Sequence, residues 1–96
     1  MLGTCGEYII NSANTDDNIV DLIKQNETDL GLKYLPKPFI LKKLGIKSDS
    51  TCKIQINKHT FEISANEPLE IGYNLMDIYS IKSQTVGPKL VIRYLY

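Results

Sequence analysis

The feature that most constrains the fold is a strict alternation of apolar and polar residues in two neighbouring segments, residues 52–57 and 60–64. The segments "CKIQIN" and "TFEIS" each place an apolar side chain at every second position. Successive side chains of a β-strand point to opposite faces, so this period predicts two strands with one buried face. The inward set is Cys52, Ile54, Ile56, Phe61 and Ile63. The intervening "NKH", residues 57–59, predicts a tight turn, so we expect a β-hairpin.

Three further segments carry the strand signal. "EPLEIGY" predicts a short strand with Leu69 and Ile71 inward. "DIYSIKS" predicts another, in which Ile78 and Tyr79 compete for the core and Ile81 joins Tyr79. "LVIRYLY" predicts the last strand, after a turn at "VGPK", and is expected to close the β domain. Short strands separated by turn signals predict a mainly β (α+β) fold, a small antiparallel β-sandwich or barrel.

The segment "YLPKPFILKKLGI" leads into the strands. Its prolines, Pro36 and Pro38, exclude a helix and remove two backbone donors. The following apolar residues predict extended chain entering a strand, and Gly45 is expected to mark a bulge or kink.

One short helix is expected over about residues 16–26, within "TDDNIVDLIKQN". Thr15 is the expected N-cap, and Asp16 and Asp17 fall in the first turn, where the helix dipole favours negative charge. Helical spacing gathers one apolar face from Ile19, Val20, Leu22 and Ile23. A helix this short is marginal alone, so we expect it to pack on the β domain.

The length of 96 residues favours one structural domain. Within it we expect an N-terminal segment, residues 1–33, with the short helix, and an antiparallel β domain, residues 34–96. The longest apolar runs are a few residues, far below the roughly 20 that cross a bilayer, so no membrane segment is expected. The N-terminus has no basic start before an apolar block, so a cytoplasmic site of synthesis and folding is expected.

The net charge is zero, but the charges are segregated along the chain. Residues 1–32 carry six acidic residues and one lysine, whereas residues 33–58 carry seven lysines and one aspartate. Residues 59–96 carry three basic and four acidic residues. Such opposite poles can pair within the fold or complement a neighbour in a repeated assembly.

The residue types that carry catalysis are sparse. The single histidine, His59, falls at the predicted hairpin tip, and Asp16 and Asp17 are explained by capping. Cys5 and Cys52 are expected to be free thiols, and two cysteines with one histidine fall short of the four ligands of a structural zinc site. We therefore expect no catalytic, metal-binding or cofactor-binding residues, and not an enzyme.

Lysines 42 and 43 head the basic stretch, with Tyr34 and Phe39 nearby. Nucleic-acid modules combine a basic face with stacking aromatic rings. Here the rings lie among prolines and aliphatic residues, and the pI is about 6.5, so nucleic acid is not an expected partner.

Six tyrosines are present, and four of them fall in the β half. Their rings suit ordinary packing or a protein interface, and both readings stay open. Arg93 is the only arginine; the alternation places it opposite Ile92 and Tyr94, on a face shared with Val91 and Leu95. The interface candidates are Arg93, Tyr94, Tyr96, Tyr73, Tyr79, Lys42 and Lys43.

Residues 34–96 resemble small virion proteins of tailed bacteriophages and prophages of Gram-positive bacteria. In those proteins a segment like "KPF" leads into a "lkklGI" stretch, matched here by "LKKLGI". A hairpin like "v.iNg..i.I" follows, matched by residues 54–63, and then "leigY…I.sik", matched by residues 69–81. The last strand resembles "viRYLY", matched by residues 91–96.

The resemblance implies a non-enzymatic structural protein of the virion, in the tail, baseplate or neck or as a capsid decoration. It implies partners among other virion proteins or copies of this chain, in a symmetric assembly formed in the host cytoplasm. Two alternatives remain open: a β-sandwich that binds carbohydrate or a host receptor, and a small phage protein that binds a host protein.

Overall fold

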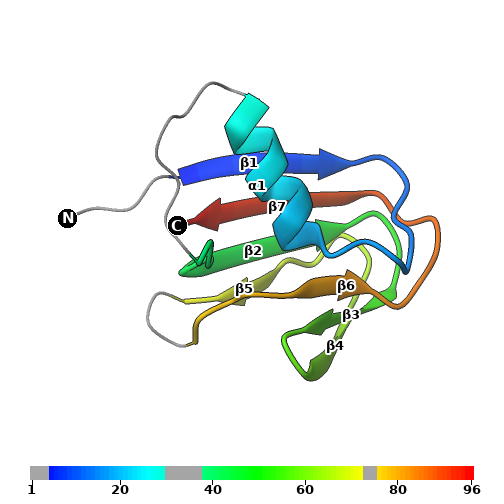
Figure 1. Cartoon of the computed structure of the whole chain (residues 1–96). Helices are drawn as coiled ribbons and strands as arrows, with labels where there is room; N and C mark the ends of the chain where they lie inside the picture. The colour runs from blue at the N-terminus through cyan, green and yellow to red at the C-terminus, as the bar shows by residue number, and fades with distance from the viewer. Residues whose placement is uncertain (1–4, 30–37, 73–75) are drawn as a thin grey trace.

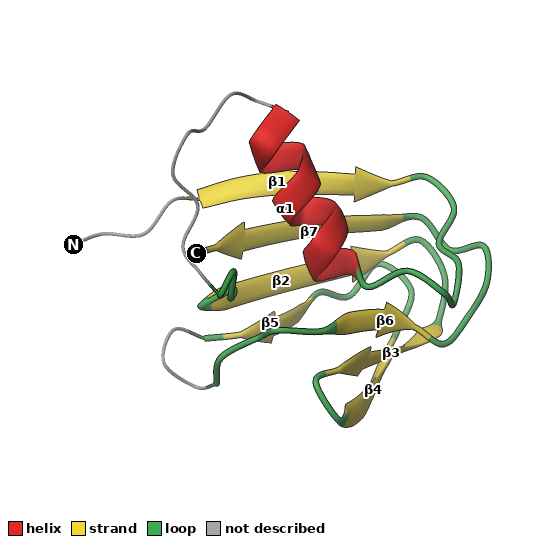
Figure 2. Cartoon of the chain, in the orientation of Figure 1, coloured by secondary structure: helices red, strands yellow, loops and turns green. Residues whose placement is uncertain are grey.

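The computed structural model describes residues 5–29, 38–72 and 76–96. Figures 1 and 2 show the described elements in chain order. They are β1 (Cys5–Ile10), α1 (Ile19–Asp29), β2 (Lys43–Ser48), β3 (Cys52–Ile56), β4 (His59–Ile63), β5 (Leu69–Ile71), β6 (Ile81–Ser83) and β7 (Leu90–Leu95).

The strands form two antiparallel sheets. The larger sheet has the order β1-β7-β2-β5, and the smaller has the order β4-β3-β6. Helix α1 lies across β1 and β7 on the side of the larger sheet that faces the core (Figure 1). The mainly β, sandwich-like fold with one short helix is confirmed, and no described helix is long and apolar enough to cross a membrane.

One apolar core joins both sheets and α1. Its fully buried side chains include Ile23 from the helix, Ile46 and Ile92 from the larger sheet, and Ile54 and Ile81 from the smaller. The alternation in β7 has the expected phase: every second residue from Leu90 is buried, while Arg93 is exposed on the other face. The period of two in the sequence therefore set the inner and outer faces of the larger sheet.

The predicted hairpin is confirmed as β3 and β4, with Cys52 opposite Ile63 and Ile56 opposite His59. Its turn comprises Asn57 and Lys58, so His59 begins β4 instead of lying in the turn. Asn57 has a φ of 55°, a left-handed conformation that asparagine tolerates better than most residues.

The side chain of Asn57 joins this turn to the chain before β6. Its Nδ2 donates to the Asp77 carbonyl at 2.8 Å, and its Oδ1 accepts the Tyr79 N–H at 3.0 Å. The backbone N–H of Asn57 also donates to the Ser80 carbonyl at 2.8 Å. The backbone groups of the segment before β6 are therefore hydrogen-bonded although this segment is not part of a strand.

Two strands end with the same local structure. The triplet Ile-Lys-Ser closes β2 at Ser48 and β6 at Ser83, and both serines are buried. Each serine Oγ donates to the carbonyl two residues further on, at 2.6 Å, and accepts the N–H of that residue. A buried hydroxyl is costly unless bonded, and this serine turn bonds it while ending the strand.

The helix begins three residues later than predicted and ends at Asp29. Thr15 is not the N-cap; Asn18 is, because its Oδ1 accepts the Val20 N–H at 3.1 Å. The predicted first turn instead forms a separate turn around Asn14, whose Oδ1 accepts two backbone N–H groups of the aspartates that follow it. Asx turns and N-caps use the same side-chain chemistry, so the sequence offered two starts and the tertiary contacts selected the later one.

Strand β1 was not predicted, although "CGEYII" carries a weak alternation. It pairs along its whole length with β7, from Cys5 opposite Leu95 to Ile10 opposite Leu90. The N-terminal segment therefore contributes an edge strand to the larger sheet, as well as the helix that covers it.

Two expectations inside the strands were wrong. Gly45 makes no bulge, because its register runs unbroken against Arg93 and Glu70. The irregularity lies at Lys42, whose N–H donates to the Leu95 carbonyl at 2.6 Å although Lys43 is the register partner of Leu95.

In the segment before β6, Ile78 takes the core and bridges Leu41, while Tyr79 is 51% exposed. Ile81 is buried, so it does not share a face with Tyr79. Because Ile78 pairs with Leu41 in an isolated bridge, the alternation predicted for "DIYSIKS" does not run through the segment as one strand.

Candidate interaction surface

The face of the larger sheet that points away from the core is open to solvent within the described residues. We call it the outer face; it comprises Cys5, Glu7, Ile9, Lys43, Gly45, Lys47, Glu70, Val91, Arg93 and Leu95. None of these ten residues is buried, whereas the core-facing positions of the same strands are mostly buried. The three-stranded sheet and α1 both pack on the opposite face, which leaves the outer face available for a partner.

The antiparallel register sets the outer-face side chains in rows across the strands. In the central row Glu7 lies opposite Arg93, Arg93 opposite Gly45, and Gly45 opposite Glu70. No atom lies within 4 Å of the position that a Cβ on Gly45 would take, so the row has a gap between Arg93 and Glu70.

That gap belongs to an open groove of about 780 Å³. Its lining combines the carboxylates of Glu7 and Glu70 with the cations of Lys43 and Arg93, and the exposed thiol of Cys5 lies at its edge. Both charge signs in one shallow site favour a partner with charges of both signs over a simple anion or cation.

Arg93 is bound to Glu7 by an ion pair of 3.0 Å between Nε and Oε2. The arginine side chain is 80% exposed, so the pair contributes at most about 1 kcal/mol to stability. The ion pair matters more for orientation than for stability. It holds Nε of Arg93, so that the rest of the guanidinium projects from the outer face. An oriented, exposed arginine is the kind of residue that anchors protein interfaces.

Apolar side chains flank this row on the same face. Ile9 is 49% exposed, and Val91 and Leu95 are half-buried. Lys43 lies in the row of Leu95 and Cys5. Apolar contact area beside an arginine is common at the centre of protein interfaces, and mixed charge is common at their rim.

Two of the predicted interface tyrosines, Tyr94 in β7 and Tyr96 just after it, do not point to the outer face. Tyr94 is 4% exposed, and its hydroxyl donates to Glu27 Oε1 of α1. The hydroxyl of Tyr96 donates to the other oxygen of Glu27 at 3.1 Å, and its ring packs 4.9 Å from that of Phe39. These contacts give both tyrosines a role inside the domain.

Burial raises the pKa of the Tyr94 hydroxyl well above its usual value of about 10, and the hydrogen bond to Glu27 raises it further. Glu27 itself is 3% exposed, so its carboxyl depends on the two tyrosine hydroxyls for hydrogen bonds. We call Glu27, Tyr94 and Tyr96 the tyrosine–glutamate cluster.

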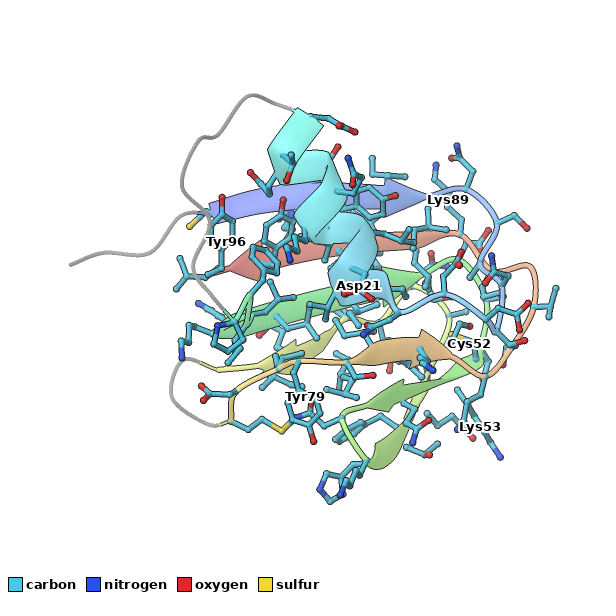
Figure 3. The ribbon with its side chains drawn as sticks, in the orientation of Figure 1. Asp21, Cys52, Lys53, Tyr79, Lys89 and Tyr96 are labelled. Carbon is cyan, nitrogen blue, oxygen red and sulfur yellow. The ribbon has the colours of Figure 1, made fainter. Side chains whose placement is uncertain are left out.

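The other predicted interface residues are scattered. Tyr79 and Tyr96 lie at separate places on the molecule (Figure 3). Lys42 forms an ion pair with Asp77 at 2.9 Å, and Tyr73 lies outside the described residues. Of the six candidates that the structure describes, only Arg93 and Lys43 have side chains that come together on one exposed surface.

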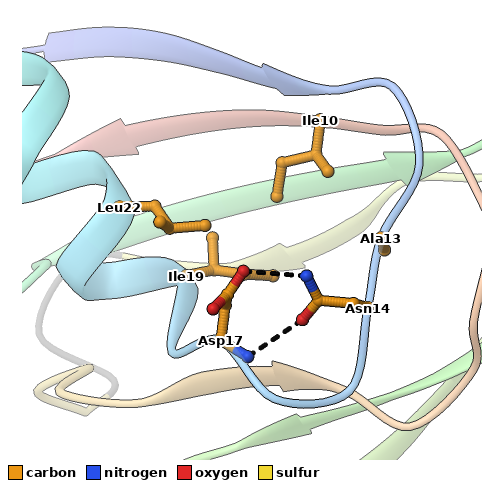
Figure 4. Close-up of a pocket in the computed structure, with 6 residues that line it drawn as sticks. All are labelled: Ile10, Ala13, Asn14, Asp17, Ile19 and Leu22. Carbon is orange, nitrogen blue, oxygen red and sulfur yellow. Dashed lines mark hydrogen bonds between the residues drawn. The ribbon is translucent and has the colours of Figure 1, made fainter.

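A second hollow lies between the end of β1 and α1 (Figure 4). Its volume is about 20 Å³, enough for about one water molecule. Ile10, Ile19 and Leu22 form its apolar side, and Asn14 and Asp17 bond to each other across its mouth at 2.8 Å. It is a packing gap beside the asparagine turn, too small for a ligand.

Among the described residues, no three side chains of the metal-ligating types come together. Cys5 and Cys52 are both free, the first exposed and the second buried. Sequence reasoning placed Arg93 on the outer face but missed its ion-pair partner Glu7 and the carboxylate of Glu70 in the same row. The alternation of "GEYII" and "LEI" carried a signal for them, but only the strand order brings them into one row.

In comparisons with protein-family models, curated proteins and solved structures, no match to this chain was found.

Proposed function

We propose that this chain is a non-enzymatic structural protein of a bacteriophage virion that acts through protein–protein contacts of its outer face. The observation that carries the proposal is the open outer face itself, with an oriented arginine beside a groove and apolar residues around it. The resemblance of residues 34–96 to small virion proteins of tailed phages supplies the biological setting.

The groove supports a protein partner over a small molecule. A groove that is open to solvent and lined by charges of both signs does not enclose a ligand as most small-molecule sites do. A protein surface can instead place opposite charges against Arg93 and Glu70 and cover Ile9, Val91 and Leu95 at once. The partner is another virion protein or a further copy of this chain, in the tail, baseplate, neck or capsid.

The carbohydrate alternative has weaker support. Sugar-binding faces use aromatic platforms, and the ten side chains of the outer face include no aromatic ring. A small phage protein that binds a host protein would use the same outer face, so only the identity of the partner separates it from the leading proposal.

The test is to delete the gene in the strain that encodes it, induce phage particles, and restore the gene in variant forms. We expect the protein in purified particles by mass spectrometry, and fewer or defective particles from Arg93→Ala combined with Lys43→Ala. The matched control is Lys82→Ala, which removes an exposed lysine from the smaller sheet. Absence of the wild-type protein from purified particles would refute the virion role.

A further inference from the structure

Strand β1 forms an edge of the larger sheet, because among the described residues it pairs with β7 alone (Figure 1). The direction of its backbone groups follows from β7. The Lys42 N–H donates to the Leu95 carbonyl, so Leu95 turns its backbone groups toward β2. These groups alternate along an antiparallel strand, so Tyr94 and Ile92 turn theirs toward β1. The Ala13 N–H bonded to the Pro88 carbonyl at 2.9 Å fits the same phase.

The phase decides which groups of β1 stay open. Gly6 and Tyr8 are the register partners of Tyr94 and Ile92, so their N–H and C=O groups bond to β7. The backbone groups of Cys5, Glu7 and Ile9 therefore point out of the sheet, and no described residue bonds them. An edge strand with a row of such groups is a template for another strand.

Within the part of the chain that the structure describes, the other sheet edges are protected and that of β1 is not. The β6 edge is blocked, because the Asn18 side chain accepts the Ile81 N–H at 3.1 Å. The β5 edge is three residues long and follows Pro68. The β4 edge carries exposed charge at Glu62, beside His59 and the turn lysine. Short length, proline and charge are the usual defences against strand pairing.

Strand β1 has none of these defences. It is six residues long, with no proline, lysine or break in register. Its single charge, Glu7, is already paired with Arg93, so the edge presents no net charge that would select a charged partner. Ile9 is one of the large apolar side chains that the structure leaves half exposed. A neutral, apolar and regular edge of this kind can pair with the same strand of a second copy, because no net charge repels across the pair.

We infer that β1 pairs with β1 of a second copy of this chain, antiparallel about a two-fold axis, so that two four-stranded sheets become one of eight strands. An antiparallel partner continues the pattern of the whole larger sheet. This self-association does not rest on the proposed function, because it uses the edge of the sheet and leaves the outer-face residues of β7, β2 and β5 open.

Charge selects the register of the pairing. Opposed residues must share a sheet face, so the axis passes through a residue of β1. An axis at Glu7 would oppose two carboxylates, which is unfavourable. An axis at Tyr8 opposes Glu7 to Ile9 of the second copy, so the aliphatic stem of the glutamate covers an exposed isoleucine. The open backbone groups of both residues then bond across the axis.

The experiment measures self-association of the full chain by sedimentation velocity over a range of concentrations. We expect a dimer whose population rises with concentration. Ile9→Pro removes an N–H that points out of the sheet, so the pairing with β7 is retained and dimerisation weakens about tenfold or more. Ile9→Lys adds a charge at the same point and has the same expected effect. Far-ultraviolet circular dichroism checks that both variants keep the fold.

Two control variants separate this edge from other surfaces. Thr60→Lys adds the same charge on β4, at the edge of the other sheet, and Lys82→Ala removes an exposed lysine from the smaller sheet. Both should dimerise like the wild type. A wild-type chain that stays monomeric up to its solubility limit refutes the inference, and so does a dimer that persists unchanged in Ile9→Lys.

Hydrogen exchange on the wild-type chain decides the matter without any variant. The Glu7 and Ile9 amides should exchange more slowly as protein concentration rises, while the Lys53 amide, on the other sheet, should not change. If the exchange rates of the Glu7 and Ile9 amides do not change with protein concentration, the pairing is refuted. Failure of the dimer would leave the virion proposal standing, and absence from virions would leave the dimer standing.

Discussion

Each face of the larger sheet carries a β7 side chain bonded to a glutamate, but the inner pair is buried and the outer pair is exposed to solvent. On the inner face, Tyr94 is buried and bonded to the buried carboxyl of Glu27. On the outer face, the next residue back along β7, Arg93, is exposed and bonded to Glu7. Each pair is joined by a side-chain hydrogen bond. A buried polar group that loses its partner destabilises the fold, whereas an exposed polar group that loses its partner is solvated by water. The inner pair therefore bears on stability, and the outer pair is free to serve binding.

The largest effect should follow removal of Glu27. Glu27→Ala removes the buried carboxyl that accepts hydrogen bonds from the hydroxyls of Tyr94 and Tyr96, so we expect a loss of about 3 kcal/mol in the free energy of unfolding. Urea denaturation measures it. The matched control on the outer face is Glu7→Ala, which should cost about 1 kcal/mol or less. Equal losses in the two variants would contradict the contrast between the faces.

Two glycines give a second contrast between the faces. A Cβ on Gly6 would collide with the Tyr94 hydroxyl and approach Glu27 Oε1 at 2.8 Å, whereas one on Gly45 would meet nothing within 4 Å. We expect Gly6→Ala to destabilise by about 2 kcal/mol through overpacking.

Gly45→Ala, by contrast, should be neutral or stabilise by about 0.5 kcal/mol, because glycine is unfavourable inside a strand. Thermal unfolding of the two variants side by side measures both effects. A loss in Gly45→Ala as large as that in Gly6→Ala would show that the outer face is packed.

A third effect depends on pH. The pKa of Tyr94 is raised in the folded chain, so above pH about 10 the unfolded chain loses this proton first. The contribution of Tyr94 to the free energy of unfolding is therefore complete below pH about 10. It is lost as the pH rises toward the pKa that Tyr94 has in the folded chain. We expect the free energy of unfolding to fall above pH about 10, and to fall less steeply in Tyr94→Phe. Parallel pH profiles for the two proteins would contradict this.

A small effect on stability should also come from Arg93→Ala. Its ion pair is exposed, so we expect a change of less than about 1 kcal/mol, which shrinks further as salt is added. A destabilisation above about 2 kcal/mol by urea denaturation would mean that the arginine is structural, and would remove it as an interface residue.

Much of the fold could be predicted because its signals are local. The hairpin of β3 and β4 and the phase of β7 follow from a period of two that is visible over a few residues. The placement of Arg93 on the face opposite Tyr94 is confirmed for the same reason. The start of the helix was missed because Thr15, Asn14 and Asn18 all carry side chains that can begin a turn.

The sequence by itself determined the hairpin of β3 and β4, the inward residues of β7 and the absence of any long apolar segment, since these depend on neighbours in the chain. Only the tertiary structure decided that β1 joins β7, that Glu27 meets Tyr94 and Tyr96, and that Arg93 shares a face with Glu7, Lys43 and Glu70. The physical reason is sequence separation: Glu27 and Tyr94 are 67 residues apart, and Glu7 and Arg93 are 86 apart. No local pattern encodes such pairs, because they follow from the order of strands in the sheet.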